Sequence, residues 1–279
     1  MIGVVERIDS HQHFWKFDPD KDAWITPDME AIRKDFLPDD LRPLLSAAKM
    51  DGSVTVQVDQ TAKETLLMLR LADQNPFIKG IVGWVDLRSP GVKDQLAYLS
   101  QYKKLKGFRH IVQAEPDGFL LQKEFLNGIR ALADFGYTYD LLIYPKQLPE
   151  AVQFISQFPD QKFVLDHLAK PFIRTGNLDP WTKQITALAS AGNIYCKLSG
   201  IVTEADWRKW GLKTFLPYLD VVFSCFGPKR LLYGSDWPVC LLASTYPQQL
   251  AIVEDYINQL TPSEKQGIMG ENAVQFYNL

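Results

Sequence analysis

Short apolar runs alternate with helical patterns along the chain. The apolar runs predict strands over 4–10, 53–58, 78–85, 105–111, 137–143, 162–166, 194–198 and 230–233. Leucines and other apolar residues at helical spacing predict helices over 38–50, 63–74, 92–102, 122–135, 149–157, 180–191, 247–259 and 262–276, and an interrupted one over 206–226. Regular alternation of strand and helix predicts a parallel sheet covered by helices.

The number of these units favours a closed barrel. Eight strand-then-helix units in 279 residues fit an α/β fold of the (β/α)8 TIM-barrel type. An open doubly wound sheet would usually bind a nucleotide through a Gly-x-Gly-x-x-Gly turn after an early strand, and this sequence has none. Because the pattern has no break in composition, we expect a single barrel domain over 1–279.

The connection over 14–37 is long and aromatic. It contains Trp15, Phe17, Trp24 and Phe36, which is too many aromatic residues for a disordered linker. A connection of this length usually carries function or folds over another part of the molecule. It is expected to form either a lid on a site or a satellite hydrophobic cluster.

Composition excludes several classes of protein. The chain is 46% hydrophobic and 23% charged. Its formal net charge is -3 and the sequence contains no long basic stripe, so a nucleic-acid partner is not expected. No apolar run approaches the length that spans a membrane. Cys196, Cys225 and Cys240 are too scattered for a disulfide framework. We therefore expect a cytoplasmic protein without a membrane partner; a homo-oligomer is left open.

Polar side chains follow three of the predicted strands. His11 and His13 follow the first strand, His167 the sixth and Asp236 the eighth. In barrels of this type the catalytic groups lie at the carboxyl ends of the strands, and closure places the first strand beside the eighth. Asp236 is thus predicted to lie beside the histidine pair, although Pro238 also allows it to cap a helix. Imidazoles and carboxylates can bind metals or transfer protons.

Further candidates occupy other strand ends. Only one of Arg109 and His110 can point inward, and we favour Arg109, with His110 in packing. Lys197 is expected either in a buried ion pair or against substrate. Asp9, rather than taking part in a site, could simply accept hydrogen bonds from loop amides. The remaining strand-end candidates are Gln57, Trp84 and Trp237, of which the tryptophans fill a core more often than they do chemistry.

Together these residues resemble a known family. The segments 9–15 (DSHQHFW), 107–110 (GFRH), 165–171 (LDHLAKP), 197–200 (KLSG) and 232–238 (LYGSDWP) are similar to those of the amidohydrolase superfamily. The resemblance is strongest to its amidohydrolase-2-related lactonases, of the L-fuconolactonase and L-rhamnonolactonase type. It covers nearly the whole chain and implies a distorted (β/α)8 barrel that hydrolyses a cyclic ester.

The resemblance also implies a metal site. His11, His13, His167 and Asp236 match the superfamily's metal ligands. The superfamily's bridging lysine or glutamate after strand four and histidine after strand five are absent, because Arg109-His110 and 141–144 (LLIY) stand there. We therefore expect at most one divalent ion, with zinc as the first candidate, or a metal-independent enzyme.

The implied reaction assigns roles to these residues. Asp236 would be the general base that activates water, while His167 and Arg109 would stabilise the carbonyl oxygen of a sugar-acid lactone. The expected substrate-binding residues are Trp15, Trp24, Gln57, Trp84, Lys197 and Trp237. The alternatives are a related decarboxylase of a small carboxylic acid and a sugar-acid binding protein without turnover. The sequence does not choose the lactone or its ring size.

Overall fold

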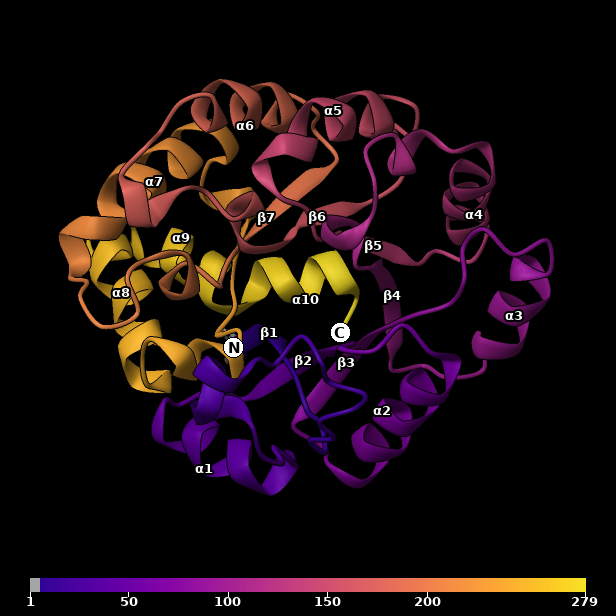
Figure 1. Cartoon of the computed structure of the whole chain (residues 1–279), viewed down its shortest axis with the longest axis horizontal. Helices are drawn as coiled ribbons and strands as arrows, with labels where there is room; N and C mark the ends of the chain where they lie inside the picture. Colours follow the sequence, from indigo (N-terminus) through magenta and orange to yellow (C-terminus); the bar gives the residue numbers. More distant parts are fainter. Residues whose placement is uncertain (1–5) are drawn as a thin grey trace.

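The chain folds into a barrel of eight parallel strands, β1 to β8, paired in chain order. The structure is a computed structural model that describes residues 6–279. The strands are β1 (Ile8–Gln12), β2 (Gly52–Val56), β3 (Ile78–Gly83), β4 (Leu105–His110), β5 (Thr138–Leu141), β6 (Phe163–Leu165), β7 (Ile194–Leu198) and β8 (Leu231–Tyr233). The prediction of a (β/α)8 barrel is confirmed (Figure 1). Positions 4 and 5 of the first predicted strand lie outside the described residues.

The barrel is closed by backbone contacts just beyond β8. Gln12 forms a parallel bridge with Trp237. The backbone N–H of His13 donates to the Trp237 carbonyl at 2.7 Å, and that of Asp236 donates to the His11 carbonyl at 2.8 Å. The seam between the first and last strands therefore runs through the residues predicted to form the site.

Helices surround the strands. They are α1 (Pro38–Ala47), α2 (Ala62–Gln74), α3 (Val92–Leu99), α4 (Lys123–Asp134), α5 (Leu148–Ser156), α6 (Trp181–Ala189), α7 (Leu212–Phe226), α8 (Tyr246–Ile257), α9 (Pro262–Gln266) and α10 (Asn272–Tyr277). In Figure 1 they form a ring around the barrel, except for α10, which lies across its opening.

Two helix predictions were wrong in detail. Residues 206–211 form turns, and α7 begins only after Gly211. It then passes through Pro217, which costs a helix one backbone hydrogen bond and does not end this one. The helix predicted over 262–276 is divided, because a π-helical turn at Gly267–Glu271 separates α9 from α10.

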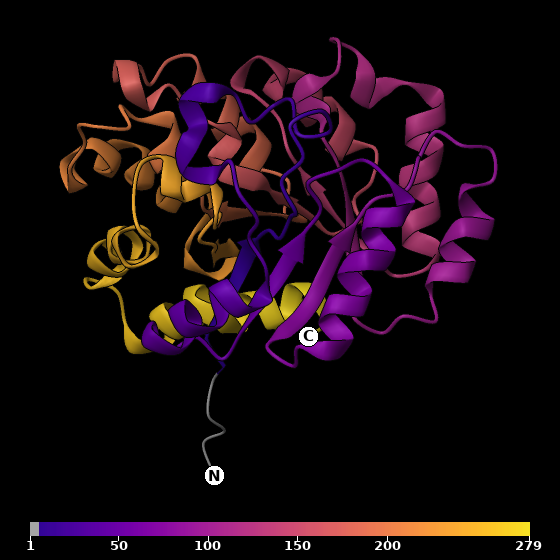
Figure 2. The same cartoon turned by 60° about the horizontal axis from the view of Figure 1, so that its bottom comes forward.

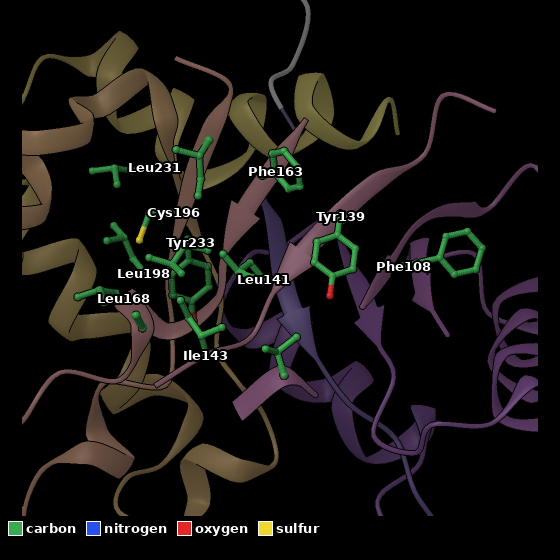
Figure 3. Packing of buried hydrophobic residues seen from close by; sticks show 14 of the residues in the cluster. Phe108, Tyr139, Leu141, Ile143, Phe163, Leu168, Cys196, Leu198, Leu231 and Tyr233 are labelled. Carbon is green, nitrogen blue, oxygen red and sulfur yellow. The ribbon is translucent and has the colours of Figure 1, made fainter. Parts of the chain in front are cut away.

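Two hydrophobic clusters stabilise the barrel. The larger one lies between strands and helices, and Figure 3 shows Phe163, Cys196 and Leu231 of β6, β7 and β8 within it. The smaller cluster fills the barrel interior, where Val164 and Leu232 meet Phe276 of α10. Since side chains alternate along a strand, Val164 and Phe163 can serve different clusters. The helix α10 thus closes one end of the barrel and leaves the carboxyl ends of the strands for a site.

The 14–37 segment is part of the main core. Trp15 and Phe36 pair as an antiparallel bridge, and a 3-10 helix, η1, spans Pro27–Ile32. Its buried apolar side chains, including Ile25 and Ile32, join the larger cluster, so the expectation of a separate satellite cluster was wrong. Figure 2 shows this indigo segment on the side of the barrel opposite α10.

Among the helices in the described part of the chain, none is long and apolar enough to cross a membrane.

Candidate active site

A cavity of about 520 Å³ opens at the carboxyl ends of the strands. Six of the predicted site residues line it. Those six are His13, Trp15, Trp24, Arg109, His167 and Asp236. A cavity of this size suits a small molecule.

The histidines and Asp236 form a compact cluster at the base of this cavity. The Nε2 atoms of His11 and His13 are 3.1 Å apart. Oδ1 of Asp236 lies 3.4 Å from Nε2 of His13 and 3.8 Å from Nε2 of both His11 and His167. The spatial grouping expected from closure of the barrel is therefore present.

The backbone is strained where it presents two members of this cluster. His167 and the three residues after it have φ between 52° and 57°, and Asp236 has φ of 57°. Left-handed backbone is unfavourable for residues other than glycine and persists only where the surrounding structure imposes it, often at functional sites. The turn after His167 is held by a hydrogen bond from the Trp181 indole to the Leu168 carbonyl, at 2.9 Å.

Two glycines allow close packing against the histidines. A Cβ at Gly200 would lie 2.5 Å from Nδ1 of His167, and φ of this glycine is +62°. A Cβ at Gly234 would lie 2.7 Å from Cβ of His11. These close contacts explain why the strand-end segments KLSG and LYGSD contain glycine at these positions.

Hydrogen bonds behind two of the rings fix their orientation. Nδ1 of His13 lies 2.7 Å from the Val56 carbonyl, which can only accept, so the proton of a neutral His13 ring is on Nδ1. Nδ1 of His167 lies 2.9 Å from the Ser199 hydroxyl. Both arrangements turn Nε2 toward Asp236. Partners of this kind orient metal-ligating or catalytic imidazoles.

A buried network of charges lies beneath the cluster. The Asp166 carboxylate accepts a hydrogen bond from Nη1 of Arg109 at 3.0 Å and forms an ion pair with Nζ of Lys197 at 3.1 Å. Nδ1 of His11 lies 3.3 Å from the Asp166 carboxylate and 3.2 Å from Nζ of Lys197. Lys197 also donates to Asp140, which accepts a further bond from the Tyr277 hydroxyl of α10 at 2.8 Å. The network joins the site to the helix that closes the other end of the barrel.

Burial decides the protonation states of the imidazoles. It lowers the pKa of His11 well below its usual value, with repulsion from Lys197 adding to the effect. It lowers the pKa of His167 to about 4, against the opposing attraction of Asp236. Burial favours the neutral form of Asp236, but attraction to His167 and the hydrogen bond with His13 outweigh it, so its pKa is lowered. An ionised Asp236 carboxylate beside these imidazoles can accept a proton or share in binding a cation.

The cluster fits one divalent ion. His11, His167 and Asp236 each offer a ligand atom, and these atoms lie within 4.8 Å of one another. Imidazoles bound to tetrahedral zinc at about 2.0–2.1 Å place their nitrogens roughly 3.3 Å apart. The 3.1 Å separation of the His11 and His13 nitrogens is close to this spacing. No bridging lysine or glutamate lies among these ligands, so the residues fit one ion rather than two.

Other predicted site residues lie outside the cavity lining. Gln57 accepts from Arg109 with its side chain at 3.0 Å, and also with its backbone carbonyl, so it holds the guanidinium in place. Lys197 forms the buried ion pair that was one of its two expected roles. Trp237 is buried against Phe14 and Phe36. These three therefore lie around or beneath the lining.

The structure shows where His110, Trp84 and Asp9 lie relative to the cavity. His110 packs on Phe119 with ring centroids 4.7 Å apart, while Arg109 faces the cavity, as predicted. The Trp84 indole lies 3.3 Å from His110, outside the lining. Asp9 accepts from the backbone N–H of Ser235 at 2.8 Å, so it does bind loop amides.

Several residues of the site were not predicted. Asp140 of β5 and Asp166, directly after β6, could have been found from strand alternation, because each is a buried charge next to an apolar run. The cavity lining also includes polar and aromatic residues that follow β5, β6 and β7: Tyr144, Lys170, Thr203, Glu204 and Trp207. Loop residues like these carry no periodic signal in a single sequence.

Comparisons with known proteins agree with this geometry. Residues 8–279 match the family model described as amidohydrolase. An L-fucono-1,5-lactonase from Burkholderia multivorans is 38% identical, with 98% of this chain and 96% of that protein covered. One from Burkholderia ambifaria is 35% identical over the same shares of the two chains. The crystal structure of a Burkholderia multivorans amidohydrolase with bound zinc is 37% identical, with a TM-score of 0.95 over 98% of this chain and 99% of that one.

Proposed function

The chain belongs to the amidohydrolase family, and from this premise we propose that it opens a sugar-acid lactone by attack of water. The observation that carries the proposal is the placement of Asp236 among three histidines at the base of the cavity. The relatives named as L-fucono-1,5-lactonases make that lactone the first substrate to test.

Asp236 acts as the general base in this proposal. Its carboxylate lines the cavity, and Nε2 of His13 at 3.4 Å holds it in place. It takes a proton from water as the oxygen attacks the lactone carbonyl. General base catalysis of this kind contributes typically about 10²–10⁴-fold to the rate.

When no ion is bound, Arg109 and His167 stabilise the negative charge that develops on the carbonyl oxygen. Both line the cavity, and Arg109 is oriented by Asp166 and Gln57. A cationic donor fixed in advance is effective in a water-poor site because it need not reorganise during the reaction. Trp15 and Trp24, whose rings meet edge to face at 5.9 Å, offer apolar surface to the sugar ring.

His11, His13, His167 and Asp236 would hold the single divalent ion, for which zinc is the first candidate. When bound, such an ion polarises the carbonyl and lowers the pKa of water. We expect zinc to bind the protein with one ion per chain, and the variant His11→Ala to lose most of this binding. Metal analysis after dialysis measures how many ions are bound per chain, and an activity assay of the chelated protein shows whether the ion is required for turnover. Two ions per chain, or unchanged binding by the variant, would contradict this ligand set.

A panel of aldonolactones tests the proposed function. Purified protein is mixed with 1,5- and 1,4-lactones of L-fuconic and L-rhamnonic acids, and acid release is followed with a pH indicator. We expect turnover of at least one 1,5-lactone. Carbon dioxide release from small carboxylic acids, or binding of sugar acids without any lactone turnover, would instead support the decarboxylase or the binding protein.

We place this activity in the cytoplasm. Cys196, Cys225 and Cys240 are all unpaired, which suits a reducing compartment.

A further inference from the structure

A second carboxylate lies in the wall of the cavity. Glu204 ends a 3-10 turn, η7 (Val202–Glu204), that follows β7. It lines the same cavity as Asp236, His167 and Arg109. Among residues 6–279, its carboxylate has no hydrogen-bond or ion-pair partner, whereas Asp236 is engaged by the histidines. Glu204 is thus free to contact a molecule in the cavity.

The turn that carries Glu204 is held on both sides. The Thr203 hydroxyl donates to the Gly200 carbonyl at 2.8 Å, and the Trp207 indole donates to the Thr203 carbonyl at 2.9 Å. Gly200 in turn packs on the His167 ring. The position of Glu204 is therefore tied to that of the histidine cluster.

The charges around Glu204 come from four elements. Burial raises its pKa, and the negative charge of Asp236 after β8 acts in the same direction. Lys170 after β6 and Arg174 in η6 (Ile173–Thr175) oppose this rise. Tyr144, after β5, also lies near Glu204: burial raises the pKa of the Tyr144 phenol, and the negative charge of Glu204 adds to this rise. Two cations nearby and a cavity open to solvent let the carboxyl group lose and regain a proton.

We propose that Glu204 is the general acid that protonates the departing ring oxygen of the lactone. This inference rests on the proposed lactonase function. Ester hydrolysis needs a proton at the leaving alkoxide as well as a base for water. Asp236 and Glu204 line the same cavity from different loops, after β8 and after β7, so in this proposal Asp236 serves the water and Glu204 serves the ring oxygen.

The steps balance as a simple hydrolysis. Water loses a proton to Asp236, and its oxygen forms a bond to the carbonyl carbon. The bond from that carbon to the ring oxygen then breaks, and the ring oxygen takes the proton of Glu204. The product is the open hydroxy acid. Solvent reprotonates Glu204, and Asp236 returns its proton to solvent, so both groups regain their starting states.

The variants Glu204→Gln and Glu204→Asp test this role. Glutamine keeps the shape and the hydrogen-bonding capacity but cannot donate the proton as an acid. We expect kcat for the lactone to fall about 10²–10⁴-fold, with KM changed by less than about threefold. The alkaline decline of kcat in the wild-type pH profile should disappear in Glu204→Gln and remain in the slower Glu204→Asp.

Controls separate this role from binding and from folding. Glu124→Gln, on the exposed face of α4, should match the wild-type enzyme in kcat and pH profile. Glu204→Gln should also unfold at the wild-type temperature, since it removes no contact. A kcat within threefold of wild type, a loss seen only in KM, or an alkaline decline that persists in Glu204→Gln would overturn the inference while leaving the lactonase function standing. If wild-type protein opens no lactone, both proposals fail.

Discussion

Two buried residues only two positions apart in β1 have different roles. Asp9 and His11 belong to one strand and are both fully buried, yet only His11 reaches the cluster around Asp236. Asp9 holds the Ser235 backbone at 2.8 Å and the Tyr246 hydroxyl at 3.0 Å. It therefore joins β1 to the segment after β8, next to the seam that forms the site.

The pKa of Asp9 makes this contribution depend on pH. Burial raises that pKa from 3.8 to about 6. As pH rises, Asp9 therefore ionises at a lower pH in the unfolded chain than in the folded protein. Its contribution to the free energy of unfolding is fully present below pH 3.8 and is lost as pH passes about 6. Relative to Asp9→Asn, the wild-type free energy of unfolding should fall by up to about 3 kcal/mol between pH 4 and 7.

Urea unfolding at several pH values measures this difference. Asp160→Asn, at an exposed position, serves as the control and should follow wild type. A constant difference between wild type and Asp9→Asn across this range would show that Asp9 does not ionise late in the folded protein.

At the scale of elements, alternation along the strands places charges inside the barrel. Phe163 and Leu165 of β6 face the helices, while Val164 faces the interior and Asp166 follows it at the next inward position. Lys197 of β7 occupies the corresponding place between Cys196 and Leu198. The alternation of side chains that identified the strands therefore also predicts this buried charge network, because charged residues at inward positions of neighbouring strands must lie close together.

The network should contribute strongly to stability. Lys197 is fully buried and is the cation shared by Asp140 and Asp166. Lys197→Met would leave two buried carboxylates with less compensation, so we expect the free energy of unfolding to fall by about 3–5 kcal/mol. The matched control is Lys146→Met, which breaks an exposed pair with Asp117 and should cost about 1 kcal/mol or less. Urea unfolding of the two variants compares them directly, and equal losses would mean that the buried pairing is energetically unimportant.

At the scale of the whole molecule, the sequence predicted the architecture well because that architecture is periodic. The eight strands and the order of the helices follow from alternating patterns, and closure of the barrel then places Asp236 beside His11 and His13. Trp15, Trp24 and Arg109 also reach the cavity from the predicted segments.

What the sequence did not predict depends on irregular backbone. The left-handed turn after His167 and the 3-10 turn carrying Glu204 set which loop residues face the cavity. Neither conformation has a periodic pattern. Trp84 and Trp237 illustrate the converse, because a strand-end position alone does not decide whether a large ring lines the cavity or fills the core.

The central claim is that barrel closure places Asp236 where it activates water. Its most direct test is the turnover of Asp236→Asn on the lactone that the wild-type protein opens. Asparagine preserves the size and the backbone contact with His11 but cannot take the proton. We expect kcat to fall about 10²–10⁴-fold while the circular-dichroism spectrum shows that the variant keeps the wild-type fold. Turnover close to that of wild type would contradict the account.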